Sequence, residues 1–146
     1  MMKQEKLPQT HLIEMVQTAL QNGQEITIAA NGWSMFPCLR PSDVVKIHPT
    51  PFSELKFGDI IAFQRKHQLI VHRYVAHNTT QGDSCLRADE PITEKNYIGK
   101  ISAFQRDKLP MKTIDRLDYW KKIIYYFGKM ARFTNWMLLR IRLKLR

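Results

Sequence analysis

Two side chains in this 146-residue sequence could together carry out nucleophilic catalysis, namely Ser34 and His72. A serine hydroxyl is a weak nucleophile unless a neighbouring base takes its proton. Ser34 follows the Asn31-Gly32 turn, directly behind a β-like run, where a turn can present the hydroxyl at a strand end. His72 lies in the apolar run LIVHRYV, and neutral imidazole can accept a proton near neutral pH. Each residue alone also has a structural explanation, because turn serines and buried core histidines are common.

The surroundings of Ser34 could stabilise the negative charge that develops on a carbonyl oxygen during acyl transfer. Gly32 and the backbone amides around Ser34 are candidates for such an oxyanion hole. Pro37 would restrict the chain just after the site. Further along, the carboxylate of either Asp83 or Asp89 could hold a catalytic imidazole in one tautomer. Both aspartates could equally have a structural role in turns, where this residue type is frequent.

The elements that must position these residues are mainly β. Between residues 25 and 105, turn signals separate several short β-like runs, with no helix between them, which favours a rolled antiparallel sheet. Within one of these runs, alternation predicts that Ile70, His72 and Tyr74 share one face. The runs lie at residues 25–30, 43–48, 59–64, 69–77 and 97–104.

Helices are expected only on either side of this β region. Apolar spacing over residues 10–22 predicts a short amphipathic helix that packs on the core and ends at Gly23. After a linker, basic residues interleave with apolar ones at helical spacing. The predicted organisation is an N-terminal helix in residues 1–24, a peptidase-like β domain in 25–112 and a basic amphipathic helical tail in 113–146.

The composition fits one domain with its own core, since 44% of the residues are hydrophobic and 25% charged. Of the net charge of +10, residues 116–146 carry +8, so the basic character belongs to the tail. We expect the two cysteines to be reduced thiols, although one bridge would also be compatible with the sequence. The chain shows neither a signal peptide nor an apolar run of the roughly 20 residues that cross a bilayer. We therefore expect a cytoplasmic protein, either soluble or bound peripherally at the inner face of the membrane.

Over roughly residues 25–105 the sequence resembles the type I signal peptidases. Bacterial members commonly use Lys as the base, whereas archaeal and endoplasmic-reticulum-type members carry His followed by Arg, so this chain resembles the Ser/His branch. The self-cleaving repressor peptidases share the serine motif and the fold but use Lys. Four motifs stand in the family's order: Ser34-Met35-x-Pro37 followed by Leu39, Gly58-Asp59-Ile60-Ile61, His72-Arg73, and Gly82-Asp83 with Asp89.

The resemblance implies a signal-peptidase-like sheet, with Ser34 as nucleophile and His72 as general base. It favours Asp89 as the residue that orients the imidazole and leaves Asp83 to stabilise its own loop. Met35 and Pro37 come with the nucleophile motif and are expected, with Gly32, to contribute to oxyanion or substrate binding.

Four features depart from the family pattern. Ser42-Asp43 replaces the Gly-Asp pair that usually follows the nucleophile motif, which should alter only a turn. Gly32, two residues before Ser34, offers no side-chain hydroxyl to an oxyanion. Cys38 stands where Thr is frequent, and we interpret its thiol as a packing substitute. The N-terminal transmembrane anchor of the family is absent from this sequence, which argues against export-signal cleavage on the outer face of a membrane.

We therefore expect a serine endopeptidase that removes a leader, signal or pro-segment, with no metal or cofactor. The resemblance implies a small residue before the scissile bond and an extended substrate paired to a strand edge. Two alternatives stay open, a non-catalytic module that binds peptides or a membrane complex, and a self-processing regulator.

The tail is the second feature that suggests a partner. Residues 119–146 combine Trp and Tyr with Lys and Arg, which predicts binding to an anionic membrane surface. Packing on the β domain and docking to a membrane transporter are the other two candidates. Nucleic acid is not expected, since no helix-turn-helix, zinc-ligand set or aromatic β platform accompanies the charge.

Overall fold

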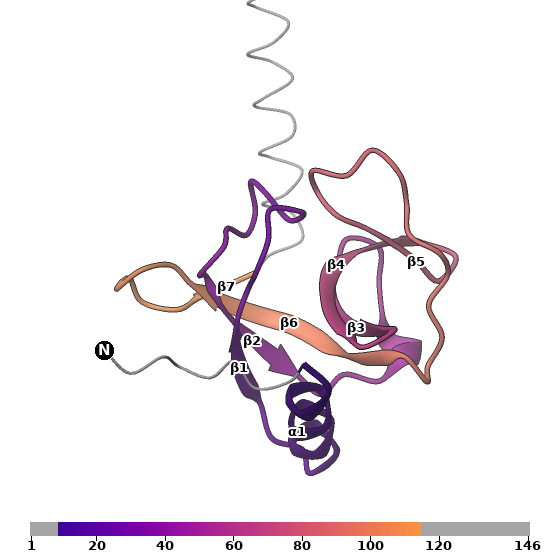
Figure 1. The fold of residues 1–146 in the computed structure, drawn as a ribbon, viewed down its shortest axis with the longest axis horizontal. Helices are drawn as coiled ribbons and strands as arrows, with labels where there is room; N and C mark the ends of the chain where they lie inside the picture. The colour runs from indigo at the N-terminus through magenta and orange to yellow at the C-terminus, as the bar shows by residue number, and fades with distance from the viewer. Residues whose placement is uncertain (1–8, 115–146) are drawn as a thin grey trace, which may run out of the picture. The chain divides into compact units, whose positions relative to one another are not determined.

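The structure has the predicted antiparallel β architecture, with one α-helix. It is a computed structural model that describes residues 9–114. The helix α1 spans Gln9–Gln21, and a 3₁₀ turn spans Phe52–Glu54. The strands are β1 (Ile26–Ala29), β2 (Val44–His48), β3 (Ile60–Arg65), β4 (Gln68–Ala76), β5 (Thr79–Gln81), β6 (Tyr97–Gln105) and β7 (Lys112–Thr113) (Figure 1).

The long strand β6 joins the two halves of the sheet. Its first residues pair with β3 and its later residues with β2, while the short β7 pairs with it from Ala103 to Phe104. All pairs are antiparallel, and the strand order is β1-β2-β6-β3-β4-β5. In Figure 1, β6 runs between the β1–β2 region and the curved β3–β4 hairpin. The two ends of this order, β1 and β5, are edge strands.

The five predicted runs correspond to β1, β2, β3, β4 and β6, and the prediction of a mainly β fold is confirmed. The strands β5 and β7 were not predicted, and they are only 3 and 2 residues long and mostly polar. Because such short segments show no alternation of apolar residues, only their pairing with neighbouring strands identifies them. β7 reaches Thr113, one residue beyond the predicted boundary of the β domain.

The helix α1 packs through residues that recur at helical spacing. Ile13, Val16 and Leu20 are buried in the main core, as expected for one face of an amphipathic helix. Met15 fits the same helical spacing but is 57% exposed, because the buried stripe runs through Ile13 instead. The helix ends at Gln21, two residues before the predicted end at Gly23. Gly23 has a φ of 74°, and its backbone N–H and that of Gln24 donate to Leu20 O and Ala19 O in a Schellman-type cap.

Two apolar clusters hold the sheet together, and β4 contributes to both. Leu69 and Val71 pack against the larger cluster, whereas Ile70 and Tyr74 pack against a smaller one built on Ile61, Phe63 and Ile92. The predicted alternation along this strand is therefore present. It places the ring of His72 on the side of the smaller cluster, against Phe63.

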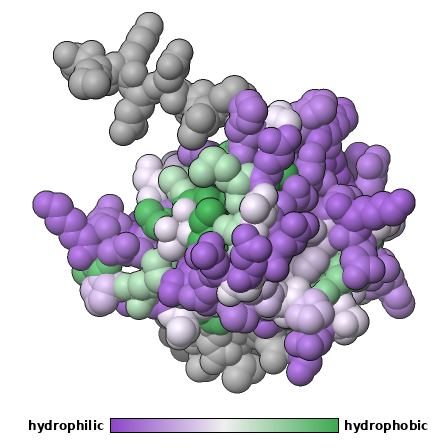
Figure 2. Space-filling view, turned by 90° about the horizontal axis from the view of Figure 1, so that it is seen from below, coloured by the Kyte–Doolittle hydropathy of each residue, from purple (hydrophilic) through white to green (hydrophobic). Residues whose placement is uncertain are grey.

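One face of the described residues is largely hydrophilic. Viewed from below Figure 1, polar side chains surround a smaller group of apolar ones (Figure 2). Within residues 9–114 no helix combines the length and the apolar character that crossing a bilayer requires. Neither Cys38 nor Cys85 forms a disulfide within the described residues. The predicted tail helix lies outside the described residues.

Candidate active site

Ser34 lies in a loop that leads from β1 to β2 and is closed by backbone hydrogen bonds. Ala30 N donates to Asp43 O at 2.7 Å, and Ser42 N donates to Ala30 O at 2.9 Å. The guanidinium of Arg106 clamps Asp43 with two hydrogen bonds of 2.9 and 2.7 Å. The base of the loop is therefore fixed to Arg106, the residue directly after β6, and this positions the residues at the tip of the loop.

The electrostatics of this clamp favour the ionised carboxylate. Burial alone would raise the pKa of Asp43, but the hydrogen bonds from Arg106 and from the Arg40 amide outweigh it and hold that pKa below its usual range. The same pairing raises the pKa of Arg106. Both groups are thus charged near neutral pH, and the loop has a stable anchor.

Within the loop, Ser34 is partly buried. Some of its neighbours point into the protein core and others point into solvent. Met35 and Leu39 point into the main core, with exposed fractions of 4% and 2%. Trp33 and Phe36 point outwards, with their ring centroids 5.7 Å apart. Because Ser34 lies between buried and exposed neighbours, its side chain is at the boundary between the core and solvent.

A second loop, which follows β5, is tied to the first one at Ser34. The backbone N–H of Ser84 donates to the carbonyl oxygen of Ser34 at 2.9 Å. The hydroxyl of Ser84 donates to the carbonyl oxygens of Trp33 and Ser34 at 2.9 and 3.1 Å. These bonds hold the serine loop against the segment that carries Asp83 and Asp89.

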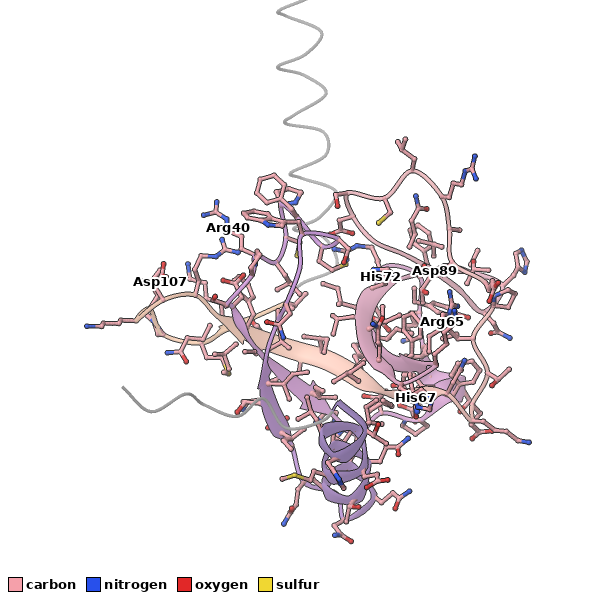
Figure 3. The ribbon with its side chains drawn as sticks, viewed as in Figure 1. Arg40, Arg65, His67, His72, Asp89 and Asp107 are labelled. Atoms are coloured by element: carbon pink, nitrogen blue, oxygen red, sulfur yellow. The ribbon has the colours of Figure 1, made fainter. Side chains whose placement is uncertain are left out.

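His72 lies in the middle of β4 and is 9% exposed. Its Nδ1 makes a hydrogen bond of 2.6 Å with Asp89 Oδ2, and its ring packs edge-on against Phe63 at 6.1 Å between centroids. Figure 3 shows His72 and Asp89 side by side, with Arg65 near them and His67 at a distance. The imidazole is therefore fixed both by a hydrogen bond and by packing.

Gly82 shows how close Ser34 and His72 are to each other. A Cβ added at Gly82 would lie 2.7 Å from the carbonyl oxygen of Ser34, 2.7 Å from Cys85 Sγ and 3.1 Å from His72 Nε2. The carbonyl oxygen of Ser34 and Nε2 of His72 are thus both within about 3 Å of the same position beside Gly82. No hydrogen bond joins Ser34 Oγ to His72 Nε2 within residues 9–114. The structure brings the two residues together without a catalytic hydrogen bond.

The carboxylate of Asp89 has two further contacts. Its Oδ2 accepts a hydrogen bond from Thr80 Oγ1 at 2.7 Å, and its Oδ1 lies 3.9 Å from Arg65 Nη1. Arg65 in turn donates to the carbonyl oxygen of Glu90 at 2.6 Å. Hydrogen-bond donors thus approach Asp89 from several directions.

Asp83, six residues earlier, has a different partner. Arg73 binds both of its carboxylate oxygens at 2.8 Å and also donates to Gly58 O at 2.7 Å. The side chains of Arg73 and Asp83 are only 3% and 1% exposed. This pair fastens the second loop to the turn before β3, and it lies outside the hydrogen-bonded group at His72.

A cleft of about 340 Å³ opens beside Ser34 and His72. One wall is the end of β1 and the following turn, residues 28–32, and the other is the first half of β4, residues 68–72. β5 pairs with β4 only from Arg73 onwards, and β1 pairs only with β2 among the described strands. Two strand edges without partners in the described sheet therefore face this cleft.

The other predicted residues occupy different places around the cleft. Gly32 and Met35 line it, the former exposed with a φ of 101° and the latter buried. Pro37 follows a cis peptide bond and is not part of the lining of this cleft as described. Within residues 9–114 no group of three or more His, Cys, Asp or Glu side chains is arranged to hold a metal ion.

Sequence reasoning missed the supporting residues of the site. Thr80, Ser84 and Arg65 have no distinctive spacing relative to Ser34 or His72, and their roles depend on strand pairing. Arg73 was noted only as part of a motif, and its ion pair with Asp83 was not foreseen. The available signal was an arginine inside the apolar run LIVHRYV, since a charge that becomes buried is usually paired.

Comparison of the chain with protein-family models, with characterised proteins and with solved structures finds no match.

Proposed function

We propose that this chain is a serine endopeptidase of the signal-peptidase type, with Ser34 as nucleophile and His72 as general base. The observation that carries the proposal is the hydrogen bond of 2.6 Å between His72 Nδ1 and Asp89 Oδ2. Because an ionised carboxylate can only accept hydrogen bonds, Nδ1 carries the proton in neutral imidazole. Nε2 then keeps its lone pair and is free to act as a base on the side of Ser34.

The proposed reaction is acyl transfer in two steps. His72 Nε2 takes the proton from Ser34 Oγ while Oγ bonds to the carbonyl carbon of the substrate. The imidazolium then returns the proton to the leaving amine, and a water molecule releases the acyl group by the same route. The missing hydrogen bond between Ser34 Oγ and His72 Nε2 is compatible with the proposal, because catalytic hydrogen bonds are often long or poorly aligned without substrate.

The cleft supports an extended peptide as substrate. Its walls are strand edges, so a peptide can pair with the backbone of residues 28–32 or 68–72 as an added strand. Ile28, Leu69 and Val71 line it with aliphatic side chains. The family resemblance adds a small residue before the scissile bond and a leader, signal or pro-segment as the part removed.

The proposal includes a rolled, signal-peptidase-like sheet. Two register shifts support it, one in the β2–β6 pair between Lys46 and Ile47 and one in the β3–β6 pair between Ala62 and Phe63. Irregularities of this kind bend strands and increase their twist. Both lie along β6, where bending would bring the β1 and β4 edges to the two sides of one cleft.

We also propose that the enzyme works in the cytoplasm, at the inner face of the membrane. The support is the sequence of residues 119–146, in which aromatic and basic residues alternate with aliphatic ones. These residues lie outside the described structure. A membrane transporter is the other partner that this segment could bind.

One observation favours a second candidate function, a peptide-binding module without catalysis. Ser34 Oγ and His72 Nε2 are not hydrogen-bonded within the described residues, while the cleft between the strand edges is already open. Such a module would bind the same extended peptides and release them uncut. Substitution of Ser34 would leave its peptide affinity nearly unchanged.

Cleavage of a panel of leader peptides, read by mass spectrometry, separates these functions. We expect one defined cut by the wild type that is lost in Ser34→Ala and in His72→Ala. The matched controls are Ser53→Ala and His67→Ala, which alter exposed residues elsewhere and should cut normally. Anionic liposomes added to one arm test the tail. Peptide binding without any cut in the wild type would refute the peptidase and favour the module.

A further inference from the structure

Thr80 is a fully buried polar residue that makes hydrogen bonds to Asp89 through both its hydroxyl and its backbone. It is the middle residue of β5 and has an exposed fraction of 0%. Its hydroxyl donates to Asp89 Oδ2 at 2.7 Å, and its carbonyl oxygen accepts from the backbone N–H of Asp89 at 2.7 Å. Thr80, on the edge strand β5, thus hydrogen-bonds to both the backbone and the side chain of Asp89.

The oxygen that Thr80 binds is the one that faces His72. Asp89 Oδ2 accepts from both Thr80 Oγ1 and His72 Nδ1, at 2.7 and 2.6 Å. The opposite oxygen, Oδ1, lies 3.9 Å from Arg65 Nη1. Arg65 is itself held by Glu90 O at 2.6 Å and lies 5.5 Å from the centre of the Phe63 ring. Without the hydroxyl, the carboxylate would be free to turn towards the guanidinium.

We infer that Thr80 is a positioning residue that holds the Asp89 carboxylate on His72 and thereby maintains the Nδ1–H tautomer. Its effect on catalysis rests on the proposed function, but its effect on the tautomer does not. Thr80 is not part of the lining of the cleft as described, so it acts on the reaction only through Asp89. The threonine hydroxyl is required as a donor, because the carboxylate offers only acceptors.

The test compares Thr80→Val, which removes the hydroxyl at nearly constant volume, with Thr80→Ser, which keeps it. The first readout is the ¹⁵N spectrum of labelled histidine at alkaline pH, with the His72 signals assigned by their loss in His72→Gln. We expect one tautomer, protonated at Nδ1, in the wild type and in Thr80→Ser. We expect a mixture of tautomers in Thr80→Val.

The matched control is Thr79→Val, on the same strand. The Thr79 hydroxyl donates to the carbonyl oxygen of Ala76 and not to the site. This variant should keep the wild-type tautomer although it also loses a hydrogen bond. Should Thr80→Val fail to fold by circular dichroism, Thr80→Ala beside Thr80→Ser makes the same comparison.

The second readout is peptide cleavage. We expect Thr80→Val to lower kcat by about 10- to 100-fold, by analogy with outer-shell residues that orient metal-bound histidines, with KM unchanged. Thr80→Ser should recover most of the loss. A folded Thr80→Val with the wild-type tautomer would overturn the inference. A wild type that cuts no peptide would refute the proposed function instead, and the tautomer comparison would still decide the role of Thr80.

Discussion

Two aspartates of the same loop, Asp83 and Asp89, differ in what their carboxylates face. Both oxygens of Asp83 are bound by the fork of Arg73, and the side chains of this pair are almost inaccessible. Asp89 instead shares one oxygen between His72 and Thr80, and its side chain is 19% exposed. A carboxylate saturated by arginine fastens a loop, whereas one bound to an imidazole can set the tautomer of a base. The first two predictions below test this division, and the other two extend it to the serine loop, which contacts Gly82 and is anchored by Asp43.

The largest effect is expected for Asp89→Asn. An amide that donates to His72 Nδ1 would force the proton to Nε2 and remove the base, so kcat should fall by about 10⁴-fold. The melting temperature should change little, because the packing of His72 against Phe63 remains. Peptide cleavage and thermal unfolding of the same preparation check both expectations. An active Asp89→Asn would contradict the assigned role.

The second prediction concerns stability rather than catalysis. Asp83→Asn should lower the free energy of unfolding by about 3–5 kcal/mol, because it breaks the buried ion pair between Asp83 and Arg73. Urea denaturation measures the loss. Asp107→Asn, at an exposed position, is the matched control and should cost almost nothing. If the two substitutions proved equally harmless, Asp83 would not be an anchor.

Gly82→Ala tests the region where the serine loop and the imidazole meet. The added Cβ would lie 2.7 Å from Ser34 O and 3.1 Å from His72 Nε2, so one of the groups must move. A displacement of about 1 Å at a reacting group can cost roughly 10²-fold in rate, and we expect a loss of that order in kcat.

The matched control for Gly82→Ala is Gly99→Ala in β6. Its Cβ would be equally crowded, at 2.7 Å from Ile47, but in the core and away from the site. This variant should lower the melting temperature and leave the kcat of the folded fraction unchanged. Equal losses of kcat in both variants would mean that Gly82 affects only folding.

The smallest effect is expected at the clamp of the serine loop, and it depends on pH. The folded-state pKa of Asp43 is lowered by Arg106, so the clamp contributes stability above the unfolded aspartate pKa of about 3.9. That contribution is lost as the pH falls through the lower, folded-state pKa. We expect Asp43→Asn to cost about 1–3 kcal/mol at neutral pH and progressively less in acid.

Urea denaturation of wild type and Asp43→Asn across this pH range measures the difference. Arg106→Gln, which removes the other partner of the clamp, should show the same dependence on pH. A difference that stayed constant into strong acid would show that the Asp43 carboxylate is not the group that titrates.

Residue types along the chain were sufficient to predict most of the sheet. Apolar runs between turn signals located β1, β2, β3, β4 and β6, and Gly23 marked the end of α1. The strands β5 and β7 could not be found in this way, because their residues are few and mostly polar. They are strands only because they pair with β4 and β6, and a single sequence does not show which segments pair.

The same limit applies to the candidate site. Ser34, His72 and Asp89 were identified because their side chains can do chemistry and their order resembles a known family. The residues that support them were not, because contacts such as the clamp between Arg106 and Asp43 join positions 63 residues apart. Thr80 contacts Asp89 only because β5 pairs with β4 and the next loop returns to it. These contacts depend on the register in which the strands pair and on how the loops fold back onto them, and neither can be read from residue types.

The most direct test of the central claim is to locate the acyl group during turnover. The p-nitrophenyl ester of a short peptide ending in Ala would be mixed with wild type, Ser34→Ala and His72→Ala, quenched in acid and mapped by mass spectrometry. We predict an acyl group on Ser34 in the wild type, strongly reduced in His72→Ala and absent from that position in Ser34→Ala. An acyl group found only on Cys85 or on lysines, with Ser34 unmodified, would contradict the assignment of Ser34 as the nucleophile.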